Sequence, residues 1–145
     1  METPSLRDAS LEDRGELEAL LEDCGLSAIG LIDALGILVV AEGGGKLLGV
    51  AGIERYGDVV LVRSVAVREG HRSRGIGEAL VSGLLGRARD LGASRAYLLT
   101  DTAERFFWAL GFETVSRSDV PAAVLASPLV ATACTEACAC MTRTL

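Results

Sequence analysis

The feature that most restricts the fold of this chain is a short glycine-containing turn, Arg-Ser-Arg-Gly-Ile-Gly at residues 72–77. Before it, residues 59–67 are mostly apolar and β-branched, which predicts a buried strand. After it, residues 78–91 repeat apolar side chains at helical spacing, which predicts an amphipathic helix. A strand, a turn and a helix start make an anion site, because the first helical N–H groups are free and the helix dipole favours negative charge there.

The residues of this turn suit a phosphate group. Gly75 and Gly77 lack a Cβ, so a pyrophosphate can approach the backbone closely, and Arg72 and Arg74 add charge-assisted donors. A Walker loop is excluded because residues 78–79 are Glu-Ala, and a dinucleotide fingerprint is excluded because its third glycine is missing. A basic helix start with flexible glycines and no ligand is the simpler alternative.

The remaining pattern, Arg/Gln-x-x-Gly-x-Gly/Ala after a strand, resembles the acetyl-coenzyme A loop of the GNAT N-acetyltransferase superfamily. Residues 64–72 resemble the strand end and turn before that loop, and residues 103–112 resemble the family's next helix, which ends in Gly-Phe. The resemblance covers roughly residues 5–145. It implies an α+β fold in one domain, residues 1–145, with a mixed central sheet flanked by helices. It also implies an N-acetyltransferase that uses acetyl-coenzyme A.

The hydrophobic pattern of the whole chain agrees with such a fold. Strands are expected at residues 5–9, 37–42, 46–55, 59–67, 96–100, 112–116 and 138–145. Helices are expected at residues 11–22, 27–34 and 78–91 and around Phe106, with one or two helical turns within residues 120–127. Hairpins early in the chain and crossovers late predict one mixed sheet.

Composition narrows the partners and the location. A length of 145 residues can bury a core, and a net charge of −6 argues against a general nucleic-acid binder. The longest uncharged stretch, residues 120–135, contains two prolines and is too short to span a bilayer. Residues 1–4 lack the features of a signal peptide. We therefore expect a cytoplasmic protein that binds neither a membrane nor nucleic acid; a homodimer is left open. The small-molecule partner is what the family resemblance implies.

The resemblance places acetyl-coenzyme A along two consecutive segments. In the family, the acetyl-pantetheine arm lies against the end of the strand before the loop, and a free N–H there can serve the oxyanion. That strand end is Val65, Ala66 and Val67 in this chain. The pyrophosphate would lie on Arg72, Ser73, Arg74, Gly75, Ile76 and Gly77. No metal is expected.

Two side chains typical of the family's chemistry are absent. The tyrosine that protonates the leaving thiolate is replaced by Phe107, and the strand glutamate that acts as base is replaced by Leu61. Glu54 is the expected substitute base, acting through water, with a solvated or arginine-paired carboxylate at the strand edge as the alternative. Among the nearby hydroxyls we predict Ser64 to be catalytic and Thr100 to contact the substrate, with structural hydrogen bonding as the alternative for both.

Arg63 is the one charged residue in an apolar run. Period-two alternation would place Leu61, Arg63 and Val65 on one face of the strand. An arginine on that face could bind a substrate carboxylate through two hydrogen bonds. The alternative is an internal salt bridge, with Glu54 as its partner.

The second half of the chain narrows the resemblance. Residues 97–107, 120–121 and 134–145 resemble the arsenic-resistance N-acetyltransferases, and the acetyltransferase domain of N-acetylglutamate synthases is similar, including the phenylalanine at Phe107. Both relatives imply that the acceptor is a small, amino-acid-like primary amine. An arsenic-containing or other toxic analogue of an amino acid is one such acceptor.

Two other functions stay open. Because the family's tyrosine and glutamate are missing, the chain could be a catalytically silent sensor that only binds coenzyme A. Cys134, Cys138 and Cys140 could instead make a thiol-based metalloid-binding protein, since thiolates bind soft ions. Buried thiols that pack as small hydrophobic groups are the simpler explanation of these cysteines.

Overall fold

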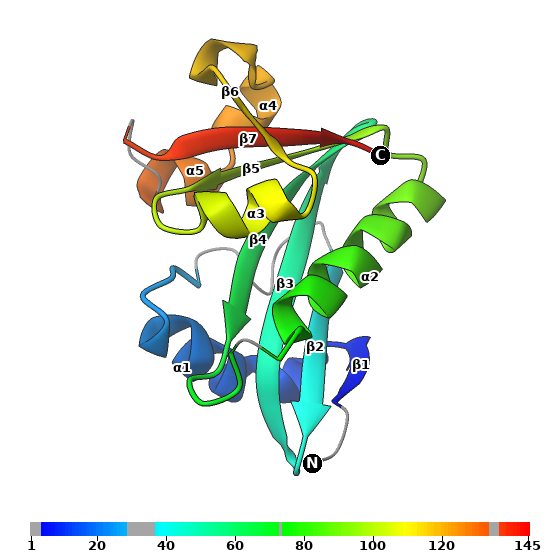
Figure 1. Ribbon diagram of the computed structural model, residues 1–145, viewed down its shortest axis with the longest axis vertical. Coiled ribbons are helices and arrows are strands. Elements are labelled where there is room, and N and C mark those ends of the chain that lie inside the picture. Colours follow the sequence, from blue (N-terminus) through cyan, green and yellow to red (C-terminus); the bar gives the residue numbers. More distant parts are fainter. Residues whose placement is uncertain (1–3, 29–36, 73, 134–136) are drawn as a thin grey trace.

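The chain folds around a mixed sheet, which we describe from a computed structural model covering residues 4–28, 37–72, 74–133 and 137–145. In these residues the sheet has seven strands in the order β1-β2-β3-β4-β5-β7-β6 (Figure 1). Neighbouring strands are antiparallel except β4 and β5, which are parallel. The strands are β1 (Ser5–Asp8), β2 (Ile37–Gly43), β3 (Lys46–Tyr56), β4 (Val59–Val67), β5 (Arg95–Thr100), β6 (Glu113–Val115) and β7 (Ala139–Thr144). The expected α+β fold with a mixed central sheet is confirmed.

Helices cover both faces of this sheet. They are the 3₁₀ turns η1 (Leu11–Asp13) and η2 (Arg117–Asp119) and the helices α1 (Arg14–Asp23), α2 (Ile76–Asp90), α3 (Glu104–Ala109), α4 (Ala122–Leu125) and α5 (Pro128–Ala133). α2 crosses one face diagonally, with α3 beside it (Figure 1). α1, α4 and α5 pack on the opposite face, where two further apolar clusters form. Across the described residues, no helix is both long and apolar enough to span a membrane.

Most expected elements are present within one or two residues. The strand at residues 59–67 is confirmed, and the following helix begins two residues earlier than expected, at Ile76. The expected helix at residues 27–34 falls almost entirely outside the described residues. α5 was not expected, because residues 128–133 have no charged side chains to mark a polar face.

A β-bulge interrupts β4. Gly52 pairs with Arg63 and Val50 pairs with Ala66, so one residue of β3 faces two residues of β4, Ser64 and Val65. Such an extra residue shifts the alternation of side chains by one. The prediction that Leu61, Arg63 and Val65 share a face is therefore wrong for Val65. Its side chain packs with the core under α2, whereas Leu61 belongs to the cluster on the opposite face.

β4 and β5 part soon after they meet. Their register pairs only residues 59–61 with residues 95–97, although β4 continues to Val67 and β5 to Thr100. Beyond Leu61, β4 stays on β3, while β5 stays on β7. Figure 1 shows β4 descending away from β5, below α3. The sheet is thus opened on one side of β4, and the candidate site lies in this opening.

The packing of α2 on β3 depends on Gly49, which gives the first prediction. A Cβ at Gly49 would lie 2.9 Å from Leu80 Cδ1 and 3.0 Å from the Ala66 carbonyl oxygen. We expect Gly49→Ala to destabilise the fold by about 1–3 kcal/mol, because the backbone carbonyl cannot move aside cheaply. Gly86→Ala is the matched control, since a Cβ there meets nothing within 4 Å, and it should stabilise α2 by about 0.5–1 kcal/mol. Urea unfolding of both variants measures the change in the free energy of unfolding. Changes of the same sign in the two variants would contradict the packing argument.

Candidate active site

The loop before α2 presents free backbone donors. Gly75 caps the helix with φ of 78°, a left-handed conformation that favours glycine. The first backbone hydrogen bond of α2 runs from the Ala79 N–H to the Gly75 carbonyl, at 3.0 Å. The N–H groups of Ile76, Gly77 and Glu78 therefore have no partner within the helix, as a bound anion requires.

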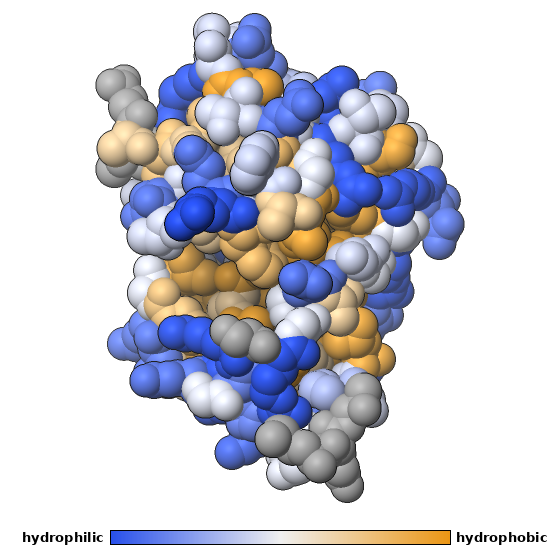
Figure 2. Space-filling view, viewed as in Figure 1, coloured by the Kyte–Doolittle hydropathy of each residue, from blue (hydrophilic) through white to orange (hydrophobic). Residues whose placement is uncertain are grey.

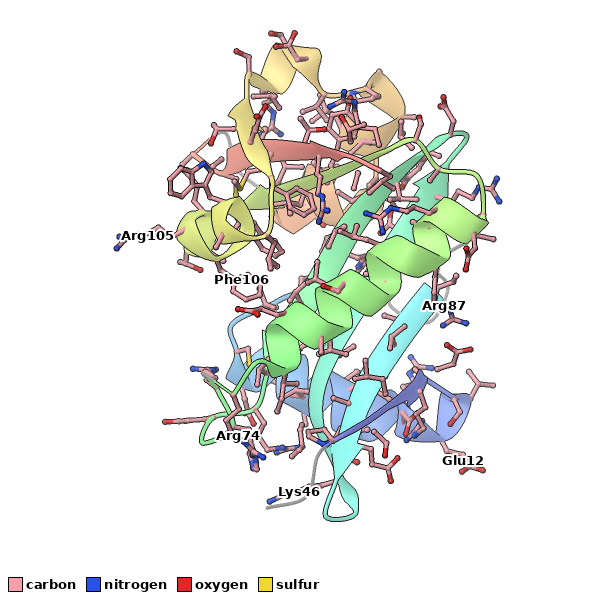
Figure 3. The ribbon with its side chains drawn as sticks, turned by 45° about the vertical axis from the view of Figure 1, so that its right-hand side comes forward. Glu12, Lys46, Arg74, Arg87, Arg105 and Phe106 are labelled. Carbon is pink, nitrogen blue, oxygen red and sulfur yellow. The ribbon has the colours of Figure 1, made fainter. Side chains whose placement is uncertain are left out.

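Two exposed arginines stand beside these donors. The Nε of Arg72 donates to the Val67 carbonyl at 3.0 Å, and Arg74 Nη1 lies 2.6 Å from His71 Nδ1. Arg74 extends from the loop at one end of the molecule (Figure 3). The structure thus brings together Arg72 and the expected residues 74–77 around one helix start, while Ser73 lies outside the described residues.

α3 forms the other side of this anion site. A Cβ at Gly77 would lie 3.1 Å from Cζ of Phe106, so the ring rests on the first turn of α2. Glycine at position 77 therefore makes room for the Phe106 ring, and this reason for the glycine was not visible in the sequence. A cavity of about 400 Å³ lies between the end of β4, the loop and the rings of Phe106 and Phe107. Figure 3 shows Phe106 and Arg74 on the same side of the molecule.

A larger cavity of about 510 Å³ fills the opening between β4 and β5. Val65, Ala66, Val67 and Arg72 line both cavities, as do Ala103 and Phe107 of the α3 region, so the two spaces join along the end of β4. In Figure 2 the middle of this face is hollowed and apolar, with hydrophilic residues below it. The combined space runs from the helix start into the sheet.

The backbone of β4 faces this space at alternate residues. The Arg68 N–H donates to the Leu48 carbonyl at 2.7 Å, and Ala66 is paired with Val50, so the polar groups of Ala66 face β3. Those of Val65 and Val67 consequently face the opening. The Val67 carbonyl accepts from Arg72, which leaves the Val65 N–H and carbonyl and the Val67 N–H directed at the cavity.

Glu54 and Arg63 form a buried ion pair. Arg63 Nη1 lies 2.6 Å from Glu54 Oε2, and the two side chains are only 2% and 8% exposed, so the expected alternative of an internal salt bridge is confirmed. Glu54 also accepts hydrogen bonds from Tyr56 and, at 2.8 Å, from Ser127. Burial pushes the pKa of Glu54 upward, but these hydrogen bonds outweigh it and hold the pKa below its ordinary value.

This setting bears on the expected base. Arg63 lines the larger cavity, but Glu54 is not among the described residues that do. A carboxylate with three donors and a lowered pKa is a weak proton acceptor. The base role of Glu54 stays a prediction, as does a substrate contact of Arg63.

The two expected hydroxyls both line the larger cavity. Ser64 Oγ accepts from Arg63 Nε at 3.0 Å, and Thr100 Oγ1 accepts from the Ala103 N–H at 3.0 Å, just before α3. Each hydroxyl thus accepts a structural hydrogen bond, as the alternative to a catalytic or substrate role expected. Each can still donate its own proton to a second partner. Phe107 borders both cavities without a polar group, and the roles of Ser64 and Thr100 stay predictions.

Other cavity residues come from segments that the sequence did not associate with the loop. Cys24, at the end of α1, lies with its Sγ 3.4 Å from Arg72 Nη2, and Leu129 and Val130 of α5 line the larger cavity. Cys138 lines it too, whereas Cys140 is buried, which raises the pKa of its thiol. Cys134 lies outside the described residues. The described residues include no group of three or more His, Cys, Asp or Glu side chains placed to hold a metal ion.

The comparison with known proteins identifies the class. Residues 5–112 match the model of the acetyltransferase (GNAT) family, and the chain belongs to this family. Its fold is therefore that of an acetyltransferase.

Solved structures share this fold. N-acetylglutamate synthase from Neisseria gonorrhoeae, in complex with coenzyme A and N-acetyl-glutamate, is 23% identical with a TM-score of 0.85 over 100% of this chain. The chain spans only 36% of that protein's length. Rv2747 from Mycobacterium tuberculosis, in complex with CoA and NLQ, is 25% identical with a TM-score of 0.81, over 98% of this chain and 99% of its own. A GNAT-family acetyltransferase from Staphylococcus aureus Mu50 is 16% identical with a TM-score of 0.83, over 99% of both chains.

The loop geometry gives the second prediction. A Cβ at Gly75 meets no atom within 4 Å, so a valine there would project into the space in front of the free N–H groups. We expect Gly75→Val to weaken coenzyme A binding by more than about tenfold, or about 1.4 kcal/mol. Gly92→Val is the matched control: Gly92 has φ of 89° and equally open surroundings, but it follows the far end of α2. Calorimetric titration should show lost affinity only for Gly75→Val, and equal affinities would contradict the anion site.

Proposed function

We propose that this protein transfers the acetyl group of acetyl-coenzyme A to the primary amine of a small, amino-acid-like molecule. The observation that carries the proposal is the continuity between the anion-binding loop and the opening beside β4. One ligand can occupy both, with its phosphate end on the helix start and its reactive end between β4 and β5. The family membership of the chain supports the same reading.

The cofactor would use the backbone more than the side chains. Its pyrophosphate would accept hydrogen bonds from residues 76–78 and from Arg72 and Arg74. Its arm would pair with Val65 and Val67 as an added strand, in the space that β5 leaves open. The Val65 N–H would then face the thioester carbonyl, where it can stabilise the oxyanion.

The acceptor would occupy the larger cavity, whose volume of about 510 Å³ suits a small molecule. Its described lining includes the hydroxyl of Thr100 and the carboxylate of Asp101, which would attract a cationic amine. The structural likeness to N-acetylglutamate synthase and the C-terminal resemblance support an amino-acid-like acceptor, an arsenic-containing analogue among the candidates.

The third prediction concerns pH and the acceptor. An aliphatic amine has a pKa well above 7, so at neutral pH most of it is protonated and cannot attack. We expect kcat/KM for amino acids and their analogues to rise from pH 6 to pH 9 as the neutral fraction grows. Release of free thiol, measured over a panel of amino acids, small amines and histone-like peptides, tests both points. A panel in which only peptides are acetylated would contradict the small-molecule proposal.

The fourth prediction separates an enzyme from a silent sensor. If solvent or a cavity hydroxyl protonates the thiolate, Phe107→Tyr should raise the rate of transfer by less than about tenfold, or about 1.4 kcal/mol of barrier. The measurement is thiol release at saturating acetyl-coenzyme A. A much larger gain would mean that the natural chain lacks a group it needs, which would favour the sensor.

A further inference from the structure

The ion pair of Glu54 and Arg63 lies where the sheet opens. Removing two charges from water costs more than their attraction returns in many proteins, so a buried pair is weak evidence for stability. In some proteins such a pair instead fixes one geometry among several. The partners of this pair show which geometry it fixes.

On one side the pair holds the bulge of β4. Arg63 Nε donates to Ser64 Oγ at 3.0 Å, and Ser64 has φ of 59°, the only positive φ of a non-glycine residue in the described segments. A serine rarely adopts this conformation without support from its surroundings. The bulge that depends on it turns the backbone of Val65 toward the cavity.

On the other side the pair holds α5. Glu54 Oε1 accepts from Ser127 Oγ at 2.8 Å, and Ser127 is 1% exposed. The carbonyl of Ser127 accepts from the Ala131 N–H at 2.8 Å, which makes Ser127 the start of α5. Leu129 of that helix lines the larger cavity. One carboxylate therefore bonds to both walls of the cavity.

We propose that Glu54 is a positioning residue: through Arg63 and Ser127 it fixes the β4 bulge and α5 relative to each other and so shapes the acceptor cavity. This inference rests on the proposed function. It assigns the Glu54 carboxylate a structural role, in which the group keeps its negative charge, in place of the role of a base. The lowered pKa of Glu54 agrees, because the group stays ionised at neutral pH.

The test begins with Glu54→Gln in the full chain. Its matched control is Glu42→Gln, which makes the same chemical change in another ion pair of the sheet. Glu42 lies in β2, next to β1, and its Oε2 is 2.6 Å from Arg7 Nε, the same distance as in the Glu54–Arg63 pair. For an amine that the wild-type protein acetylates, Glu54→Gln should raise the acceptor KM and lower kcat, each by about tenfold or more. Glu42→Gln should change neither, and equal effects of the two variants would overturn the proposal.

The pH profile separates positioning from proton abstraction. With Glu54 as a positioning residue, the profile of kcat/KM keeps its shape in Glu54→Gln and falls uniformly. With Glu54 as the base, the limb that reports its ionisation disappears, and that result would overturn the proposal.

The two connections can be tested one at a time. Ser127→Ala removes the bond between Glu54 and the start of α5, together with the interaction of Ser127 with Tyr56, and it leaves the Glu54–Arg63 pair in place. It should therefore raise the acceptor KM and leave kcat nearly unchanged. Ser64→Gly introduces a residue that adopts the bulge conformation without Arg63. Added to Glu54→Gln, it should lower the raised acceptor KM again; KM is the readout because the Ser64 hydroxyl itself is a predicted catalytic group and its loss can affect kcat. An acceptor KM that stays as high as in Glu54→Gln would overturn the connection through the bulge.

A measurement without substrate keeps the two proposals apart. Amide hydrogen exchange should become faster in α5, at the Ala131 N–H above all, in Glu54→Gln and in Ser127→Ala but not in Glu42→Gln. Unchanged exchange in α5 would overturn the positioning role, whatever the activity. If the wild-type protein acetylates no amine, the proposed function fails, and the hydrogen-exchange rates of α5 still decide whether Glu54 is a positioning residue. If Glu54→Gln does not fold, the same exchange measurement on Ser127→Ala tests the role.

Discussion

The structure depends on how far β4 is hydrogen-bonded to each of its two neighbouring strands, β3 and β5. Along β3 it is hydrogen-bonded over its whole length, apart from one extra residue, whereas along β5 only residues 59–61 are paired. A strand edge left open inside a sheet normally invites another strand. Here the open edge is covered by α3 and α5 and carries the cavity between them. The free backbone of Val65 and Val67, the two joined cavities and the buried ion pair all follow from this divergence.

Because of this divergence, the proposed cofactor contacts depend on the backbone more than on the side chains around it. The groups proposed to hold the cofactor are backbone N–H and carbonyl groups of β4 and of the first turn of α2, which no substitution except proline removes directly. Phe107 and Leu61 stand where the family resemblance predicts a tyrosine and a glutamate, and the proposed contacts of the backbone do not depend on either side chain. Side-chain identity then matters most at glycines, where a Cβ would enter the space, and at residues that hold the bulge.

Several parts of this arrangement could be read from the sequence. The apolar, β-branched run of β4, the glycine at the helix start and the helical repeat of α2 depend on neighbours along the chain, so they predicted the strand, the loop and the helix closely. The bulge at Ser64, the early end of the β4–β5 pairing and the contact of Phe106 with Gly77 depend on residues far apart in the chain. α5 has no polar face to mark it, and Cys24 reaches Arg72 across 48 positions. The strand, the loop and the helix start were therefore predictable from the sequence, while the walls of the larger cavity were not.

The exposed loop of Arg72 and Arg74 also affects how fast a ligand arrives. The chain carries a net charge of −6, so at long range it repels anions such as a phosphorylated cofactor. Among the described residues, neither arginine forms a salt bridge with a carboxylate. Both shortly precede the start of α2, the positive end of its dipole, and Figure 3 shows Arg74 at one end of the molecule. This local positive field draws an approaching anion to the helix start and away from the rest of the surface. Association is therefore steered to one orientation, and it slows as added salt shortens the reach of that field.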